Sequence, residues 1–182
     1  MSKLALAIAV WGGLAVALPI DATAASETYA DQEMASTAAA MAREDLAETF
    51  GDKDIKPGQY LWKSRTDATG PAKVVISISD QLAYLYRGDT LIAVASISTG
   101  EPGRDTPAGI FEVQDKQLLH RSIKYDNAPM PNMQRITDYG VALHAGFNPG
   151  FPASHGCIRL PAPFATKLYG VTQIGTPVLI GL

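Results

Sequence analysis

The reactive side chains of this sequence concentrate around its single cysteine, Cys157. Two of the three histidines, His144 and His155, precede the cysteine in a short segment, and Arg159 follows it. A free thiol is mostly protonated at neutral pH, so a nucleophilic cysteine needs a nearby base or cation. A histidine can remove the thiol proton, and the arginine can lower the thiol pKa or bind a substrate carboxylate. The segment therefore predicts nucleophilic catalysis by a thiol.

The backbone next to the cysteine suits a reacting carbonyl group. Gly156 carries no side chain, which leaves the N–H groups of Gly156 and Cys157 open to a carbonyl oxygen. Two such donors can hold the negative oxygen of a tetrahedral intermediate as an oxyanion hole. We therefore expect acyl-transfer chemistry at this position.

Other interpretations of these residues are simpler. A lone cysteine is often an inert buried residue, and His144 follows the apolar residues 141–143, which also fits a histidine of the core. Arg159 is equally compatible with an ion pair to an acidic side chain. The histidines and the cysteine could ligate zinc, but the sequence has neither a CxxC nor an HExxH pattern. We therefore expect neither a metal ion nor another cofactor.

Several segments resemble one known family. Residues 154–159, Ser-His-Gly-Cys-Ile-Arg, resemble the signature of the L,D-transpeptidase (YkuD-type) family, in which an upstream histidine precedes Ser/Thr-His-Gly-Cys. The ordered set of similar segments is more specific than this signature alone. The similarity implies a mainly β, YkuD-like domain, sandwich or barrel-like, with a few short helices. The other similar segments are the opening hairpin at 75–79 and 81–86, an STG element at 98–100 and a TPxGxF element at 105–111.

The resemblance also implies catalytic roles for Cys157 and His144. Cys157 would attack the carbonyl of the penultimate residue of a peptidoglycan tetrapeptide stem, releasing D-Ala and leaving a thioester. An amine would then take the acyl group. His144 would act as general base and acid, oriented by the adjacent backbone carbonyl of Ala145.

The remaining residues of the signature are implied to support this pair. Ser154 and His155, with Gly156, would shape the cysteine loop, and Arg159 would help to hold the substrate or the loop. The stretch from 144 to 154 is several residues shorter than in the better-known members. Because this stretch borders the cleft, its length bears on the choice of acceptor.

A polar, Pro-rich segment, residues 125–133, resembles the family region beside the donor cleft. We expect it to lie between strands and outside the core. Its candidate substrate-binding residues are Tyr125, Asn127, Met130 and Met133.

Three functions are compatible with this pattern. An L,D-transpeptidase would use an amine of a neighbouring stem, or of an outer-membrane protein or lipoprotein, as acceptor. An L,D-carboxypeptidase would use water in the second step. A non-catalytic wall-binding module would keep the fold without the thiol or the base, and both are present here.

Short β segments separated by turn signals surround these residues. Alternating or continuous apolar residues bounded by Gly, Pro and Asp predict strands, and two segments have helical character. The expected strands cover 73–79, 82–86, 90–98, 109–113, 140–144 and 176–180, and the expected helices lie within 31–50 and 163–169.

The N-terminus has the pattern of a targeting segment. Lys3 precedes an apolar stretch over residues 4–18, which is short for a membrane span. We expect residues 1–24 to be a signal peptide cleaved near Ala24 or Ala25, with an uncleaved membrane anchor as the alternative. Either way the protein is expected outside the cytoplasm, in the periplasm or cell envelope.

Size and charge fit one globular domain after this segment. The chain has 182 residues, of which 47% are hydrophobic and 18% charged, with a formal net charge of −3. This charge argues against a nucleic-acid partner, which needs concentrated Lys and Arg. We expect a linker or accessory segment over 25–71 and the L,D-transpeptidase catalytic domain over 72–182.

Overall fold

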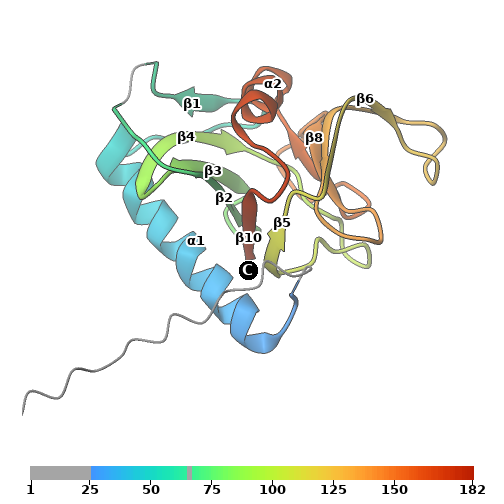
Figure 1. Ribbon diagram of the computed structural model, residues 1–182, viewed down its shortest axis with the longest axis horizontal. Coiled ribbons are helices and arrows are strands. Elements are labelled where there is room, and N and C mark those ends of the chain that lie inside the picture. The colour runs from blue at the N-terminus through green and yellow to red at the C-terminus, as the bar shows by residue number, and fades with distance from the viewer. Residues whose placement is uncertain (1–25, 65–66) are drawn as a thin grey trace, which may run out of the picture.

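The computed structural model describes residues 26–64 and 67–182. In this part of the chain the strands form two sheets, of order β1-β4-β3-β2-β10-β5 and β6-β7-β8-β9 (Figure 1). The structure confirms the expected mainly β sandwich. The larger sheet contains β1 (Tyr60–Trp62), β2 (Ala72–Ser77), β3 (Leu82–Arg87), β4 (Thr90–Ser96), β5 (Gly109–Glu112) and β10 (Pro177–Gly181). The smaller sheet contains β6 (Asp115–Arg121), β7 (Pro129–Arg135), β8 (Ala142–Ala145) and β9 (Ile158–Leu160).

The larger sheet is built on the hairpins that the turn signals predict. β2 pairs with β3, and β3 with β4, in antiparallel register. β10 returns from the far end of the sequence, lies between β2 and β5, and runs parallel to β2. Residues 74–76 of β2 are all buried because both faces of the sheet are covered, which explains their continuous apolar run.

The main hydrophobic core lies between the two sheets and helix α2 (Ala162–Val171). Val74 and Ile76 enter it from the larger sheet, Leu143 and Ile158 from the smaller sheet, and Phe164 from α2. Burying each such side chain stabilises the fold by roughly 1.5–3 kcal/mol. The core therefore fixes the inner face of the smaller sheet and leaves its outer face for other contacts.

Helix α1 (Tyr29–Phe50) covers the other face of the larger sheet (Figure 1). It begins where the side chain of Thr28 accepts a hydrogen bond from the backbone N–H of Asp31. Its buried stripe is mostly alanine, which lets the helix approach the strands closely. Residues 29–50 are therefore a helix packed on the sheet. The second core contains Ala39, Ala42 and Leu46 of α1 with Val75, Tyr84, Tyr86, Leu91 and Val94 of the sheet.

Strands β1, β6, β7 and β9 have no counterpart among the expected strands. β7 overlaps the Pro-rich segment 125–133, which we expected outside the core. That expectation is wrong for the second half of the segment, because Met130, Asn132 and Met133 are buried. Prolines and a positive φ of 55° at Asn132 interrupt the regular strand pattern, while pairing with β6 and β8 holds the strand in place.

The expected signal peptide, residues 1–24 with cleavage near Ala24 or Ala25, lies outside the described residues. Within residues 26–64 and 67–182, neither helix has the length and hydropathy needed to span a bilayer.

Candidate active site

Cys157 and His144 come from neighbouring parallel strands of the smaller sheet. β8 carries His144, Cys157 directly precedes β9, and Leu143 pairs with Ile158. Leu143 and Ile158 point into the core, so alternation places His144 and Cys157 on the opposite face. A strand spacing of about 4.8 Å and a two-residue offset put their Cα atoms about 8 Å apart. Strand pairing thus places the thiol and the imidazole close together on one face.

His144 is buried and oriented by the backbone. Its Nδ1 lies 2.9 Å from the carbonyl oxygen of Ala145, the contact that the family resemblance implies. A carbonyl only accepts, so Nδ1 carries the proton and Nε2 is the basic nitrogen of the neutral ring. Burial lowers the pKa of His144, and the charge of Arg159 lowers it further, against the contact with Ala145, which raises it. The imidazole is therefore neutral at pH 7.

Cys157 is half-buried, and its Sγ lies 3.8 Å from the carbonyl oxygen of Gly140. Burial raises the pKa of the thiol, whereas the N–H of Ala142 and the charges of Arg159 and Lys124 lower it. No hydrogen bond joins the thiol to the imidazole among the described residues. The resting pair is thus a thiol and a neutral imidazole. The side chains that pack against the cysteine are Met130, Met133 and Ala142.

The cysteine loop is held by hydroxyl groups. The Ser154 hydroxyl donates to the carbonyl oxygen of Cys157 at 2.5 Å and accepts from the N–H of Gly156 at 3.1 Å. The N–H of Gly156, which we expected in an oxyanion hole, is therefore already engaged. Ser154 shapes the loop directly, and an oxyanion would need Gly156 to exchange this bond.

A second hydroxyl ties the cysteine loop to the rest of the sheet. Thr106 donates to the carbonyl oxygen of Gly156 at 2.9 Å and accepts from the N–H of Gly100 at 2.9 Å. Thr106 is buried, and it lies in the TPxGxF element of the sequence. The sequence motif marks this residue, but its role as a bridge follows only from the structure.

Arg159 lies on β9 beside the pair. Its backbone exchanges hydrogen bonds of 2.9 and 3.0 Å with Ser98. Its aliphatic stem covers Gly146, where an added Cβ would lie 3.0 Å from the arginine Cγ. No carboxylate forms an ion pair with Arg159 in the part of the chain that the structure describes. Its charge therefore acts on both the thiol and the imidazole.

His155 links the cysteine loop to its surroundings and lines the same cavity as Cys157. Its ring makes a tilted contact with the ring of Tyr125, with centroids 4.4 Å apart and an interplanar angle of 51°, and Nε2 lies 3.8 Å from a carboxylate oxygen of Glu101. The side chain is 37% exposed. His155 thus connects the tip of the β6–β7 hairpin to the cysteine loop.

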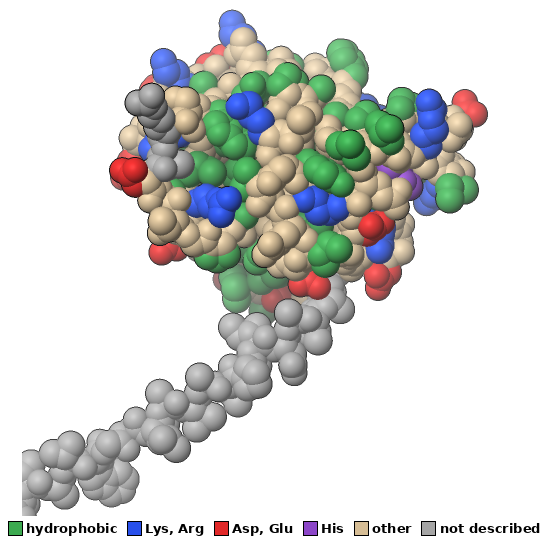
Figure 2. Space-filling model, turned by 45° about the horizontal axis from the view of Figure 1, so that its top comes forward, with side chains coloured by type: hydrophobic (Ala, Val, Ile, Leu, Met, Phe, Trp, Pro, Cys, Tyr) green, Lys and Arg blue, Asp and Glu red, His purple; other side chains and the backbone are tan. Residues whose placement is uncertain are grey.

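A cavity of about 570 Å³ opens beside the cysteine. Of the candidate substrate-binding residues, Tyr125, Met130 and Met133 line it, whereas Asn127 lies in the hairpin turn away from the lining. Cys157 forms part of its wall, and His144 does not. Figure 2 shows basic and hydrophobic side chains together with a histidine on the side where this hairpin protrudes.

The cavity wall also includes residues that the sequence did not single out. Lys124, at the hairpin tip, and Arg104, in the Gly/Pro loop after β4, bring positive charge to it. Nothing in the local sequence marks Lys124, because its place beside the cysteine depends on how the hairpin folds back. Among the described residues, no group of three or more His, Cys, Asp or Glu side chains is arranged to hold a metal ion.

Comparison with known proteins places this geometry in a family. Residues 71–180 match the sequence profile of the L,D-transpeptidase catalytic domain, YkuD. The chain belongs to this family. The matched YkuD region contains the thiol, the imidazole and the cysteine loop, and it confirms the resemblance seen in residues 154–159. No curated protein sequence matches the chain significantly.

Solved L,D-transpeptidases share the fold of this YkuD domain. One from Mycobacterium tuberculosis is 25% identical with a TM-score of 0.55, over 60% of this chain and 57% of that chain. An Enterococcus faecium L,D-transpeptidase mutant is 24% identical with a TM-score of 0.53, over 62% and 50%. L,D-transpeptidase 3 from M. tuberculosis, in complex with a faropenem-derived adduct, is 22% identical with a TM-score of 0.56, over 62% and 60%. The chain thus covers less than two thirds of the length of each of these proteins.

Proposed function

We propose that this protein is a peptidoglycan L,D-transpeptidase that uses Cys157 as its nucleophile. The observation that supports this most directly is the placement of Cys157 and His144 on one face of the smaller sheet, where β8 pairs with β9, with Cys157 at the wall of a cavity large enough for a peptide. Membership of the YkuD family supplies the reaction class.

The first half-reaction moves one proton and exchanges one bond. His144 Nε2 takes the thiol proton as Sγ attacks the carbonyl carbon of the penultimate stem residue. The tetrahedral intermediate then collapses, and the bond to the nitrogen of D-Ala breaks. The imidazolium returns its proton to that nitrogen, so that D-Ala leaves as a neutral amine and the acyl group remains as a thioester.

The second half-reaction transfers the acyl group to an amine. His144 takes a proton from the attacking amine, the new amide forms, and the sulfur leaves and regains a proton. The acceptor is an amine of a neighbouring stem or of an envelope protein. Water in place of the amine would make the enzyme an L,D-carboxypeptidase. We further propose that the protein acts outside the cytoplasm, in the periplasm or cell envelope.

Defined muropeptides test this proposal. Incubated with a tetrapeptide stem, the protein is expected to release D-Ala and form cross-linked dimers, which mass spectrometry resolves from trimmed tripeptides. Cys157→Ala should reduce release by at least about 10³-fold, and His144→Gln by about 10²–10⁴-fold. Full turnover by the folded Cys157→Ala variant would refute the assignment, and retained wall binding without any turnover would favour a binding module.

The thioester chemistry also implies acylation by β-lactams. L,D-transpeptidase 3 from M. tuberculosis is in complex with a faropenem-derived adduct. We expect a carbapenem or penem to add its mass to the protein at Cys157, and the adduct to be absent from Cys157→Ala. Intact-mass spectrometry measures both, and an unmodified wild-type protein after long incubation would contradict this expectation.

A further inference from the structure

The cavity beside Cys157 carries more positive than negative side chains. Two carboxylates, Asp105 and Asp115, face the basic and protonatable groups of its lining. Such a balance favours an anionic ligand, because buried or half-buried cations attract carboxylates. The basic and protonatable groups are Arg104, His120, Lys124, Arg135 and His155.

Most of these groups already have neighbours that offset their charge. Arg104 forms an ion pair of 2.9 Å with Glu101, whose carboxylate also lies 3.8 Å from His155. Arg135 lies 3.7 Å from Asp138 and opposite Asp115 in the β6–β7 register. These charges are therefore largely compensated within the protein.

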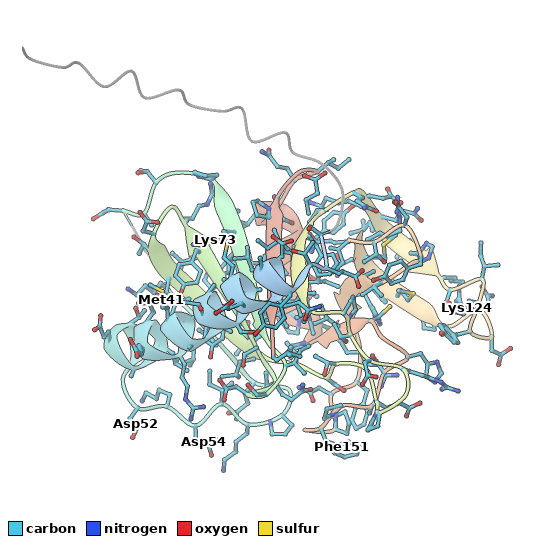
Figure 3. All side chains as sticks on the ribbon, turned by 90° about the horizontal axis from the view of Figure 1, so that it is seen from below. Met41, Asp52, Asp54, Lys73, Lys124 and Phe151 are labelled. Carbon is cyan, nitrogen blue, oxygen red and sulfur yellow. The ribbon has the colours of Figure 1, made fainter. Side chains whose placement is uncertain are left out.

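Lys124 differs from them. Within residues 26–64 and 67–182, no carboxylate forms an ion pair with its ammonium group, which lies 5.3 Å from the centroid of the Tyr125 ring. Figure 3 shows Lys124 at the tip of the β6–β7 hairpin. The positive charge of Lys124 also lowers the pKa of the Cys157 thiol, whereas burial raises it.

The hairpin tip is held against the cysteine loop. The ring of Tyr125, next to Lys124, makes a tilted contact with the ring of His155 of that loop, with centroids 4.4 Å apart. The backbone is closed by a hydrogen bond of 2.9 Å from the N–H of Ala128 to the carbonyl of Tyr125. These contacts hold the hairpin tip beside the cysteine loop, so that Lys124 lines the same cavity as Cys157.

We infer that Lys124 makes the cavity selective for donor peptides with a free carboxylate near the reacting carbonyl, and that amidated stems are poorer donors. This inference rests on the proposed function and adds a charge requirement to it. The carboxylate belongs either to the part of the stem that stays on the enzyme or to the D-Ala that leaves. The chemistry of recognition, ammonium to carboxylate, is the same in both cases.

Three donor tetrapeptides distinguish these sources: one with all carboxylates free, one amidated on the acyl side, and one with D-Ala as its amide. An exposed charge pair contributes up to about 1 kcal/mol, or about fivefold in kcat/KM. We expect the wild-type kcat/KM to fall by about fivefold for the amidated donor that lacks the recognised carboxylate. Lys124→Gln should lower kcat/KM for the free donor to that level and leave this amidated donor unchanged.

A matched control is Lys167→Gln. Lys167 is also exposed and also lies over an aromatic ring, Trp62 at 5.1 Å, but on α2 away from the cavity lining. It should behave like the wild type with all three donors. Lys124→Glu, which places a negative charge at this position, should lower kcat/KM for the free donor by more than tenfold. Circular dichroism with thermal melting checks that each variant folds.

The outcomes separate this inference from the proposed function. The quantity to compare is kcat/KM for the free donor divided by kcat/KM for an amidated donor. If this ratio is the same in the wild type and in Lys124→Gln, the charge requirement is overturned, and the transpeptidase assignment stays intact. If no donor is turned over, calorimetry can still test the charge requirement, by measuring how tightly the same three peptides bind to the Cys157→Ala variant. Tighter binding of the free donor that is lost when Lys124→Gln is added supports the inference, and equal binding overturns it.

Discussion

At the scale of single residues, the chemistry of Cys157 depends on where one proton resides before the substrate arrives. Burial favours the neutral forms of both partners, since it raises the pKa of the thiol and lowers that of His144. Arg159 opposes an imidazolium and favours a thiolate at the same time. The free enzyme therefore holds a neutral pair, and the proton moves as the carbonyl is attacked.

This arrangement predicts that the pH at which alkylation of Cys157 reaches half its maximal rate is high in the free protein. Iodoacetamide reacts with the thiolate, so the rate should rise through pH 7 to 9 and reach half its maximum above the ordinary thiol value of 9.0. Mass spectrometry measures the rate, and N-acetylcysteine under the same conditions corrects for the reagent. A rate that is already constant below pH 7 would instead indicate a preformed thiolate–imidazolium pair.

At the scale of elements, the cysteine loop is positioned by segments far apart in the sequence. Thr106 joins the loop after β4 to the loop before β9, and Ser154 closes the latter on itself. Such buried bridges stabilise the fold and also fix where the sulfur lies. Removing one of them should therefore change stability and activity together.

Thr106→Val tests this bridge. The change keeps the side-chain shape but leaves the N–H of Gly100 and the carbonyl of Gly156 without their partner. We expect the free energy of unfolding to fall by about 1–3 kcal/mol, with slower D-Ala release. The control is Thr37→Val, which removes an exposed hydroxyl from α1 and should change the free energy of unfolding by less than about 0.5 kcal/mol. Urea unfolding of both variants measures the difference, and equal effects would contradict the bridging role.

Helix α1 approaches β10 so closely that only glycine fits at one position. A Cβ on Gly181 would lie 2.6 Å from the carbonyl oxygen of Ala35. Gly181→Ala should therefore lower the free energy of unfolding by about 1–3 kcal/mol, because a backbone atom must move. Gly170→Ala is the matched control, since that glycine lies in α2 with nothing within 4 Å of its added Cβ, and it should stabilise by up to about 1 kcal/mol. Destabilisation of equal size by both would rule out the proposed contact.

At the scale of the whole molecule, the larger sheet is covered on both faces. The smaller sheet and α2 bury one face, and α1 buries the other. The active-site candidates lie on the outer face of the smaller sheet, away from α1. The accessory helix therefore supports the domain without lining the cavity at Cys157.

Truncation tests the contribution of α1. A chain that starts at Ser26 should melt as the longer chain does, because every described element is retained. A chain that starts at Gly58 should have a much lower Tm and bind a hydrophobic dye, since it exposes the apolar face that α1 covers. Equal melting temperatures for the two truncated chains would show that α1 adds no stability. The side chains exposed by the shorter chain are Val75, Tyr84, Leu91 and Val94.

The sequence by itself determined the features that depend on local chemistry. The ordered motifs identified the family, and turn residues such as those at 80–81 and 87–89 identified the hairpins of the larger sheet. The single cysteine with its histidines marked the candidate reactive segment, whose role stays a prediction. These signals are readable because a turn or a reactive side chain is specified by its immediate neighbours.

Only the tertiary structure decided features that depend on contacts between distant segments. The pairing of β7 between β6 and β8 overrode its prolines, Ser154 engaged the N–H of Gly156, and the folded hairpin brought Lys124 to the cavity. The short strands β1 and β9 are fixed by pairing with neighbouring strands, because three residues are too few for a local pattern to define a strand. Each of these outcomes comes from hydrogen bonds and burial across the fold, which the local sequence does not encode.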